Sequence, residues 1–128
     1  MILLDTHAFV WLASEPKRLP DSVQTLISRH PAALYLSVVS AWEIVMLEKR
    51  GRLELPLPAE EYIERALFRH GVHELPLNRY TAQTSVRLPD IHNDPFDRIL
   101  IAETLERGMI LVSKDRAIAR YPDVRIVW

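Results

Sequence analysis

Met1-Ile2-Leu3-Leu4-Asp5 is the stretch that decides the fold, because four apolar residues end abruptly at an acidic one. The pattern returns near the end of the chain, where Asp115 closely follows the apolar residues 109–112. Short runs that are apolar at every position are typical of strands buried on both faces of a parallel sheet. Parallel strands end at one common edge, where open α/β sheets bind their ligands. The two runs therefore predict that Asp5 and Asp115 share a site.

Stretches with strand and helix character alternate between these two runs. Further strands are expected at 34–36, 72–75 and 124–127, and helices at 6–13, 21–30, 37–50, 59–70, 81–88 and 94–107. The last helix is the best delimited, since Pro95 stands at its first position and Gly108 directly follows its end. This alternation predicts an α/β fold, a three-layer α/β/α sandwich around a central, mainly parallel sheet.

Composition narrows the class of protein. A chain of 128 residues with 48% hydrophobic content fits a single domain over residues 1–128. The absence of cysteine excludes a disulfide framework, a zinc–thiolate site and a cysteine nucleophile, and it is compatible with a reducing cytoplasm. The first apolar run is too short for a signal peptide or a membrane span, so a cytoplasmic protein without a membrane partner is expected.

The formal net charge of −1 argues against a generally basic nucleic-acid binder. The densest basic patch is Lys49-Arg50-Gly51-Arg52. This patch is either the solvated end of a helix or a local contact for phosphate.

Four acidic residues stand where an apolar run gives way to a turn or a new helix: Asp5, Glu43, Asp97 and Asp115. If they converge, their repulsion is large, because two unit charges about 5 Å apart repel by roughly 3 kcal/mol at an effective dielectric near 20. A cation between them relieves this repulsion, and carboxylate oxygens suit hard divalent ions such as Mg²⁺. Such an ion activates water and stabilises the charge that develops on a phosphodiester. The four acids therefore point to metal-assisted phosphodiester cleavage.

Three of these acids also have a purely structural interpretation. Asp5 is able to cap the helix that follows it. Asp97 is able to complement the positive end of a helix that Asp94 caps. Aspartate is common in turns, so Asp115 is able to serve as a turn residue alone. Their positions at strand ends and at a helix start are what favour a shared site.

Glu43 has two interpretations, which depend on where its helix begins. If Ser40 is the cap, Ser40 and Glu43 form a capping box and Glu43 is structural. If Ser37 is the cap, Glu43 lies in the second turn and is able to point toward the sheet edge. His92 is interpreted as a polar surface residue, with a proton shuttle or a metal ligand as the alternative. His7 has the same interpretation, since no histidine pair has the spacing of a zinc helix.

Other functional classes fit less well. A signalling receiver module needs an acid directly after its central strand, and none follows residues 34–36. A phosphatase with an aspartate nucleophile needs a second Asp two residues after the first, where His7 stands. A non-catalytic interaction protein that keeps the acids for folding remains an alternative. There is no Gly-x-Ser-x-Gly motif and no glycine-rich phosphate loop.

Taken together, four segments resemble the PIN-domain family, and the likeness spans essentially the whole chain. The segments are Ile2-Leu3-Leu4-Asp5-Thr6-His7, Ser40-Ala41-Trp42-Glu43-Ile44, Asp94-Pro95-Phe96-Asp97-Arg98-Ile99-Leu100-Ile101-Ala102 and Leu111-Val112-Ser113-Lys114-Asp115. The length of the chain and the segment Asp94-Pro95-Phe96-Asp97-Arg98 are most similar to the VapC toxins of bacterial and archaeal type II toxin–antitoxin pairs.

The resemblance implies helices packed about a parallel sheet and an endoribonuclease dependent on Mg²⁺ or Mn²⁺, with RNA as substrate and a small cognate antitoxin as inhibitor. Asp5, Glu43 and Asp97 match the family's principal acidic ligands, and Asp115 matches the fourth, more variable acid. Thr6 and Ser113 match hydroxyl positions that support the site, and Asp94 matches an acid that caps a helix or orients the ligands.

The resemblance also supports a homodimer. Apolar residues around Trp11, Val45 and Met46 motivate the same expectation, since a chain of this size does not necessarily cover them.

Overall fold

A computed structural model describes all residues, 1–128, and contains one five-stranded parallel sheet. The strands are β1 (Ile2–Leu4), β2 (Leu34–Ser37), β3 (His73–Leu75), β4 (Ile110–Val112) and β5 (Arg125–Val127), in the spatial order β3-β2-β1-β4-β5. All four pairings are parallel, as predicted. Receiver modules have the order 2-1-3-4-5, so the receiver-like alternative is wrong.

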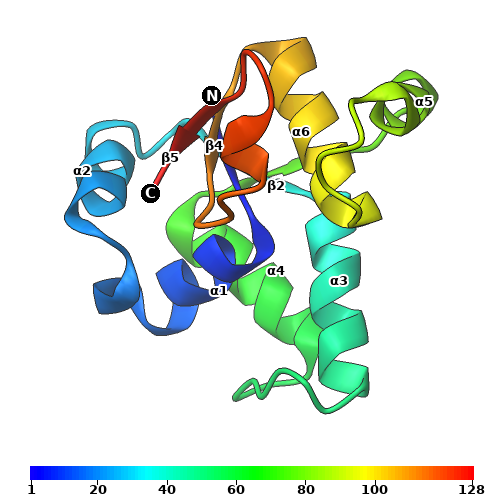
Figure 1. Cartoon of the computed structure of the whole chain (residues 1–128). Coiled ribbons are helices and arrows are strands. Elements are labelled where there is room, and N and C mark those ends of the chain that lie inside the picture. Colours follow the sequence, from blue (N-terminus) through cyan, green and yellow to red (C-terminus); the bar gives the residue numbers. More distant parts are fainter.

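Six α-helices connect the strands (Figure 1). They are α1 (Thr6–Ser14), α2 (Asp21–Arg29), α3 (Val38–Lys49), α4 (Ala59–His70), α5 (Arg79–Arg87) and α6 (Pro95–Arg107). Each predicted helix is present with ends that shift by one or two residues. Two short 3₁₀ turns, Pro16–Arg18 and Ile118–Arg120, were not predicted. None of the helices has the length and apolar character that crossing a membrane requires.

The two faces of the sheet carry separate hydrophobic cores. Along β1, Ile2 and Leu4 belong to a cluster that includes residues of α1, α2 and α4, whereas Leu3 belongs to a cluster with α6. On β4, Val112 and Leu111 divide between the same two clusters. Successive strand residues point to opposite faces, so helices must cover both. Figure 1 shows this sandwich, with α1 and α2 on the left and α5 and α6 on the right.

Glu103 of α6 is a carboxyl group inside the core. Its side chain is fully buried, Ser37 Oγ donates to Oε1 at 3.1 Å, and Oε2 has no hydrogen-bond partner. Burial raises the pKa of Glu103 from 4.5 to about 7. The folded protein therefore holds a proton on Glu103 at pH values where the unfolded chain has lost it.

This proton makes stability depend on pH. Between pH 4.5 and about 7 the unfolded carboxyl is ionised while the folded one is not, so the free energy of unfolding falls as pH rises through this window. The loss from this group is roughly 3 kcal/mol. Glu103→Gln removes the titration, and urea unfolding should show the variant gaining stability relative to the wild type as pH rises. Glu64→Gln, on the exposed face of α4, is the matched control. A constant difference between Glu103→Gln and the wild type across the window would contradict the buried proton.

Candidate functional site

An acidic cavity of about 350 Å³ lies at the carboxyl ends of β1 and β4. Its walls contain no hydrophobic residue. The lining residues are Asp5, Thr6, His7, Glu43, Asp94, Asp97, Lys114 and Asp115. The fold thus brings all four acids singled out in the sequence into one cavity.

Asp5 lies at the end of β1, the strand at which the order of strands in the sheet reverses. β2 and β3 lie on one side of β1, whereas β4 and β5 lie on its other side. The backbone N–H of Asp5 donates to Val112 O at 3.1 Å, which extends the β1–β4 ladder to the cavity. Its Oδ1 accepts from Ala8 N at 2.8 Å and caps α1. Asp5 therefore has both the capping role and the cavity position.

Glu43 reaches the cavity because α3 begins at the earlier of the two serines. Ser37 is the cap, and its Oγ accepts from Val39 N at 3.3 Å, so the capping box with Ser40 is wrong. Glu43 then lies in the second turn, where Thr6 Oγ1 donates to its Oε1. Burial raises the pKa of Glu43, and the neighbouring Asp94 and Asp5 add to the rise.

Two acids of the cavity come from the start of α6. Asp94 caps the helix, since its Oδ1 accepts from Phe96 N at 2.8 Å, as predicted. Asp97 follows in the first turn. Burial is the main cause that raises the pKa of Asp97 to about 7, and Asp94 adds to it by repulsion. The sequence pattern predicts such repulsion between the clustered carboxylates.

His92 belongs to this cluster, although the sequence placed it on the polar surface. Its side chain is only 13% exposed, and Nε2 lies 2.7 Å from Asp115 Oδ2 and 3.2 Å from Asp97 Oδ2. Nδ1 accepts from Asp94 N at 3.0 Å, so the ring hydrogen stands on Nε2 and points at both carboxylates. Burial favours neutral Asp115, but the bonds from His92 and Ala117 N outweigh it and lower its pKa.

Arg98 and Tyr121 hold the backbone of His92 in place. The Arg98 side chain is 12% exposed and donates to His92 O at 3.0 Å, while Tyr121 Oη accepts from His92 N at 2.8 Å. Arg98 also donates to four other carbonyl groups: those of Ser85, Val86, Leu88 and Pro89. Arg98 therefore positions the loop before α6, with its guanidinium bonded to backbone carbonyl groups.

The donor set of the cavity fits a divalent cation. None of the four acids forms an ion pair with lysine or arginine, and Lys114 is the only such residue in the lining. Oxygen donors with unbalanced negative charge are the ligands that Mg²⁺ and Mn²⁺ prefer. The nearest carboxylate oxygens of Asp97 and Asp115 lie within 4.8 Å of each other, close enough to share an ion, while His92 donates to both and holds them in place.

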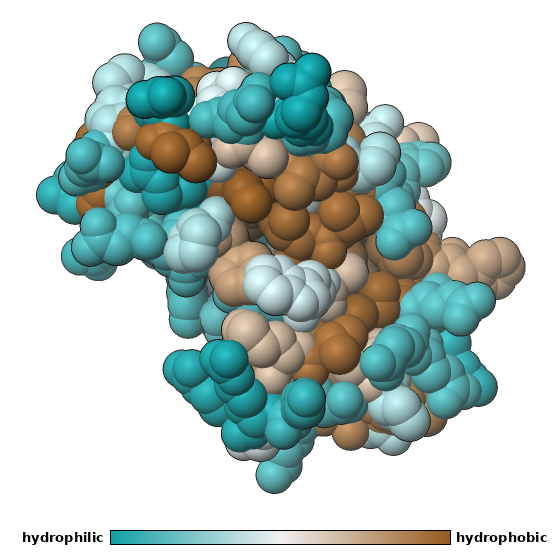
Figure 2. All heavy atoms as spheres, turned by 90° about the vertical axis from the view of Figure 1, so that its right-hand side faces the viewer, coloured by the Kyte–Doolittle hydropathy of each residue, from teal (hydrophilic) through white to brown (hydrophobic).

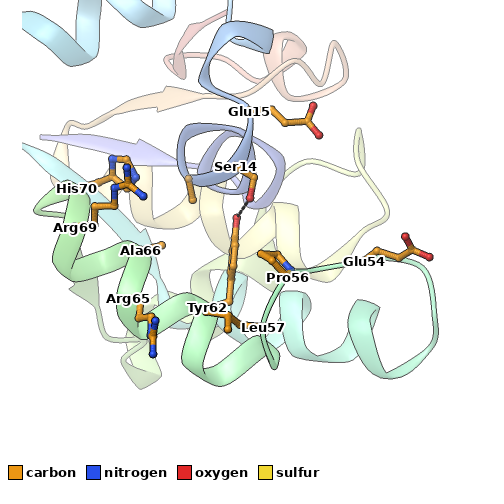
Figure 3. A pocket seen from close by; sticks show the side chains of 11 residues that line it. Ser14, Glu15, Glu54, Pro56, Leu57, Tyr62, Arg65, Ala66, Arg69 and His70 are labelled. Carbon is orange, nitrogen blue, oxygen red and sulfur yellow. Dashed lines mark hydrogen bonds between the residues drawn. The ribbon is translucent and has the colours of Figure 1, made fainter.

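A second cavity, of about 510 Å³, lies between α1, α4 and the loop before α4 (Figure 3). Ser14 Oγ and Tyr62 Oη lie 2.6 Å apart across it, and Tyr62 Oη donates to Val10 O at 3.2 Å. Its charged residues have both signs, with Glu15 and Glu54 opposed to Arg65 and Arg69. It shares no residue with the acidic cavity. The concentration of carboxylates therefore assigns the candidate site to the acidic cavity.

Several solved structures share this fold. DNA-bound VapBC from Salmonella typhimurium has a chain that matches with a TM-score of 0.72 at 15% identity, covering 98% of this chain and 96% of that one. FitAcB from Neisseria gonorrhoeae matches with a TM-score of 0.65 at 20% identity, covering 100% of this chain and 97% of that one. At these identities the likeness establishes the fold.

Sequence comparison identifies the family. Ribonuclease VapC22 from Mycobacterium tuberculosis is 32% identical over 130 residues, which span 99% of this chain and 98% of that protein. The family model of the PIN domain matches residues 2–124. The chain belongs to the PIN-domain family.

Proposed function

We propose that this protein is a metal-dependent endoribonuclease that acts as the toxin of a type II toxin–antitoxin pair. The observation that carries the proposal is the meeting of Asp5, Glu43, Asp97 and Asp115 in a cavity without hydrophobic residues. The 32% identity to a ribonuclease over nearly the whole chain supports RNA as the substrate. Action in the cytoplasm, where RNA is abundant, is part of the same proposal.

The four acids would hold Mg²⁺ or Mn²⁺, directly or through water. Such an ion supplies Lewis-acid stabilisation of the phosphate charge and lowers the pKa of water. The chain's own contribution is to fix the carboxylates: Thr6 holds Glu43, Ala8 N holds Asp5, and His92 holds Asp97 and Asp115. Fixed ligands reduce the reorganisation that binding and catalysis require.

One carboxylate of the cavity would accept the proton of the attacking water. In the metal-free protein, burial and neighbouring acids raise the pKa of Asp97 to about 7, so a bound cation would displace a proton from this site. No side-chain nucleophile is needed in this scheme, because water attacks the phosphate.

Asp5→Asn tests the assignment of the site. The amide oxygen is still able to cap α1 at Ala8, so the fold should be kept while one negative charge is lost from the cavity. RNA cleavage with Mg²⁺ or Mn²⁺ should fall by on the order of a hundredfold or more, since changes beside metal ligands alone cost up to about that much. The rise in melting temperature on adding metal should also shrink.

Asp21→Asn, at the exposed start of α2, is the matched control and should cleave RNA like the wild type. Circular dichroism verifies that both variants are folded. If the folded Asp5→Asn variant cleaves RNA with metal as fast as the wild type, Asp5 is not part of the metal site. Absence of RNA cleavage by the wild type under all metal conditions would instead favour the non-catalytic alternative.

We also propose a homodimer, on a surface that includes α3 but leaves out Trp11. Trp11 is covered within the chain, since its ring lies 5.5 Å from that of Trp128 and the Arg18 guanidinium lies 4.1 Å from its centroid. The side of the molecule with α3, α5 and α6 is a better candidate, because Figure 2 shows hydrophobic side chains gathered in its middle. Exposed residues on these helices include Trp42 at 63% and Val86 at 72%.

Val86→Glu on α5 should weaken this dimer by at least about tenfold, because a two-fold contact would bring two like charges together in a desolvated surface. Sedimentation equilibrium of the wild type should give a dimer mass, and the variant should shift toward the monomer. Phe68→Glu is the control, because Phe68 is 92% exposed but lies on α4. A monomeric wild type, or equal effects of the two substitutions, would count against the proposed surface.

A small antitoxin encoded beside this gene is the second proposed protein partner. A solved structure of the same fold supports this partner, since it is a toxin–antitoxin complex from Klebsiella pneumoniae. Expression of the toxin alone should arrest growth, and co-expression of the short neighbouring reading frame should restore growth and yield a stable complex. Failure of the two purified products to bind each other would remove this part of the proposal.

A further inference from the structure

A groove of about 550 Å³ lies next to the acidic cavity, along α3. The two hollows adjoin, because His7, Glu43 and Asp94 line both of them. Beyond these shared residues, the groove is lined by Met46, Leu47, Arg52, Leu53, Asn93, Pro95 and Phe96. Its volume is within the range of about 300–1,000 Å³ that holds ligands of nucleotide size.

The chemistry of the groove changes with distance from the carboxylates. Glu43, Met46 and Leu47 follow one face of α3 because residues three and four apart align on a helix. Met46, Leu47 and the facing Phe96 make this stretch apolar. Arg52 then supplies the only lysine or arginine in the groove lining. It forms no ion pair within the chain, so its positive charge is available to a ligand.

The backbone fixes the place of Arg52. Gly51 has a φ of +67° and ends α3, and Arg52 N donates to Leu47 O at 2.9 Å while Gly51 N donates to Glu48 O at 3.0 Å. These two bonds form a Schellman motif, which reverses the chain direction at the helix end. Arg52 is thereby held beside the groove, whereas its neighbour Arg50 is exposed and does not line it.

We propose that this groove binds the nucleotide next to the scissile phosphate of single-stranded RNA. The base packs on the apolar stretch with Phe96, and Arg52 contacts the adjoining phosphate. Recognition of unpaired RNA by apolar and aromatic surface together with arginine is the general pattern for single strands. Continuity with the carboxylates favours RNA over a protein segment, because one strand then meets the acidic cavity and the arginine in succession. The inference rests on the proposed ribonuclease activity.

Arg52→Ala and Arg50→Ala form the test pair, since both remove one exposed arginine from the same basic run. Steady-state cleavage of a short, mixed-sequence, single-stranded RNA is measured with Mn²⁺ over a series of salt concentrations. Arg52→Ala should raise KM several-fold with little change in kcat. It should also reduce the slope of log(kcat/KM) against log salt by about 0.7, the value for one phosphate contact on a single strand. Arg50→Ala should change neither quantity.

Substrate length provides a second measurement. RNA shortened from one side of the cleavage point should remove the difference between Arg52→Ala and the wild type, and RNA shortened from the other side should preserve it. A wild type that cleaves RNA while Arg52→Ala and Arg50→Ala behave alike would overturn the nucleotide subsite and leave the ribonuclease proposal standing. Loss of dimer mass or antitoxin affinity in Arg52→Ala, with unchanged RNA kinetics, would assign the groove to a protein partner. A wild type without RNA cleavage would reject both proposals.

Discussion

The parallel pairing of β1 with β4 is the constraint on which the site depends. This pairing joins the first strand of the chain to a strand near its end. The hydrogen bond from Asp5 N to Val112 O extends the pairing to the edge of the sheet. Because both strands end there, Asp5 meets the loop with Asp115 across a distance of more than a hundred residues in sequence. The starts of α3 and α6 then add Glu43 and Asp97 to the same place. A shift of register between β1 and β4 would separate these groups, even if every helix remained intact.

The clustered carboxylates at this edge of the sheet destabilise the fold, and hydrogen bonds to them reduce this effect. Desolvation raises the pKa of Asp5, Glu43 and Asp97, and repulsion by neighbouring acids adds to the rise at Glu43 and Asp97. His92 donates toward Asp97 and Asp115, and Arg98 holds the loop that carries His92. These contacts keep the acids ordered without neutralising them, which is the arrangement expected of a site that binds a cation. Geometry and charge thus support the same function.

The features of the structure that depend on local sequence patterns could be predicted from the sequence. Apolar runs ending at Asp5 and near Asp115 gave the strand ends, and Pro95 and Gly108 marked the limits of α6. Glu43 stayed ambiguous because Ser37 and Ser40 were both possible caps, and only tertiary packing decides between them. The burial of His92 depends on Arg98 and on the distant Tyr121, so no pattern around His92 reports it. The Arg52 groove likewise depends on two segments meeting in space.

The most direct test of the central claim is anomalous diffraction from crystals of the wild-type protein soaked with Mn²⁺. We expect an anomalous peak in the acidic cavity, bonded to carboxylate oxygens of Asp5, Glu43 and Asp97. A soak in Mg²⁺ should give metal–oxygen distances of about 2.1 Å at the same position. An acidic cavity that stays empty at saturating Mn²⁺, or an ion bound only elsewhere, would contradict the claim that these residues form a metal site.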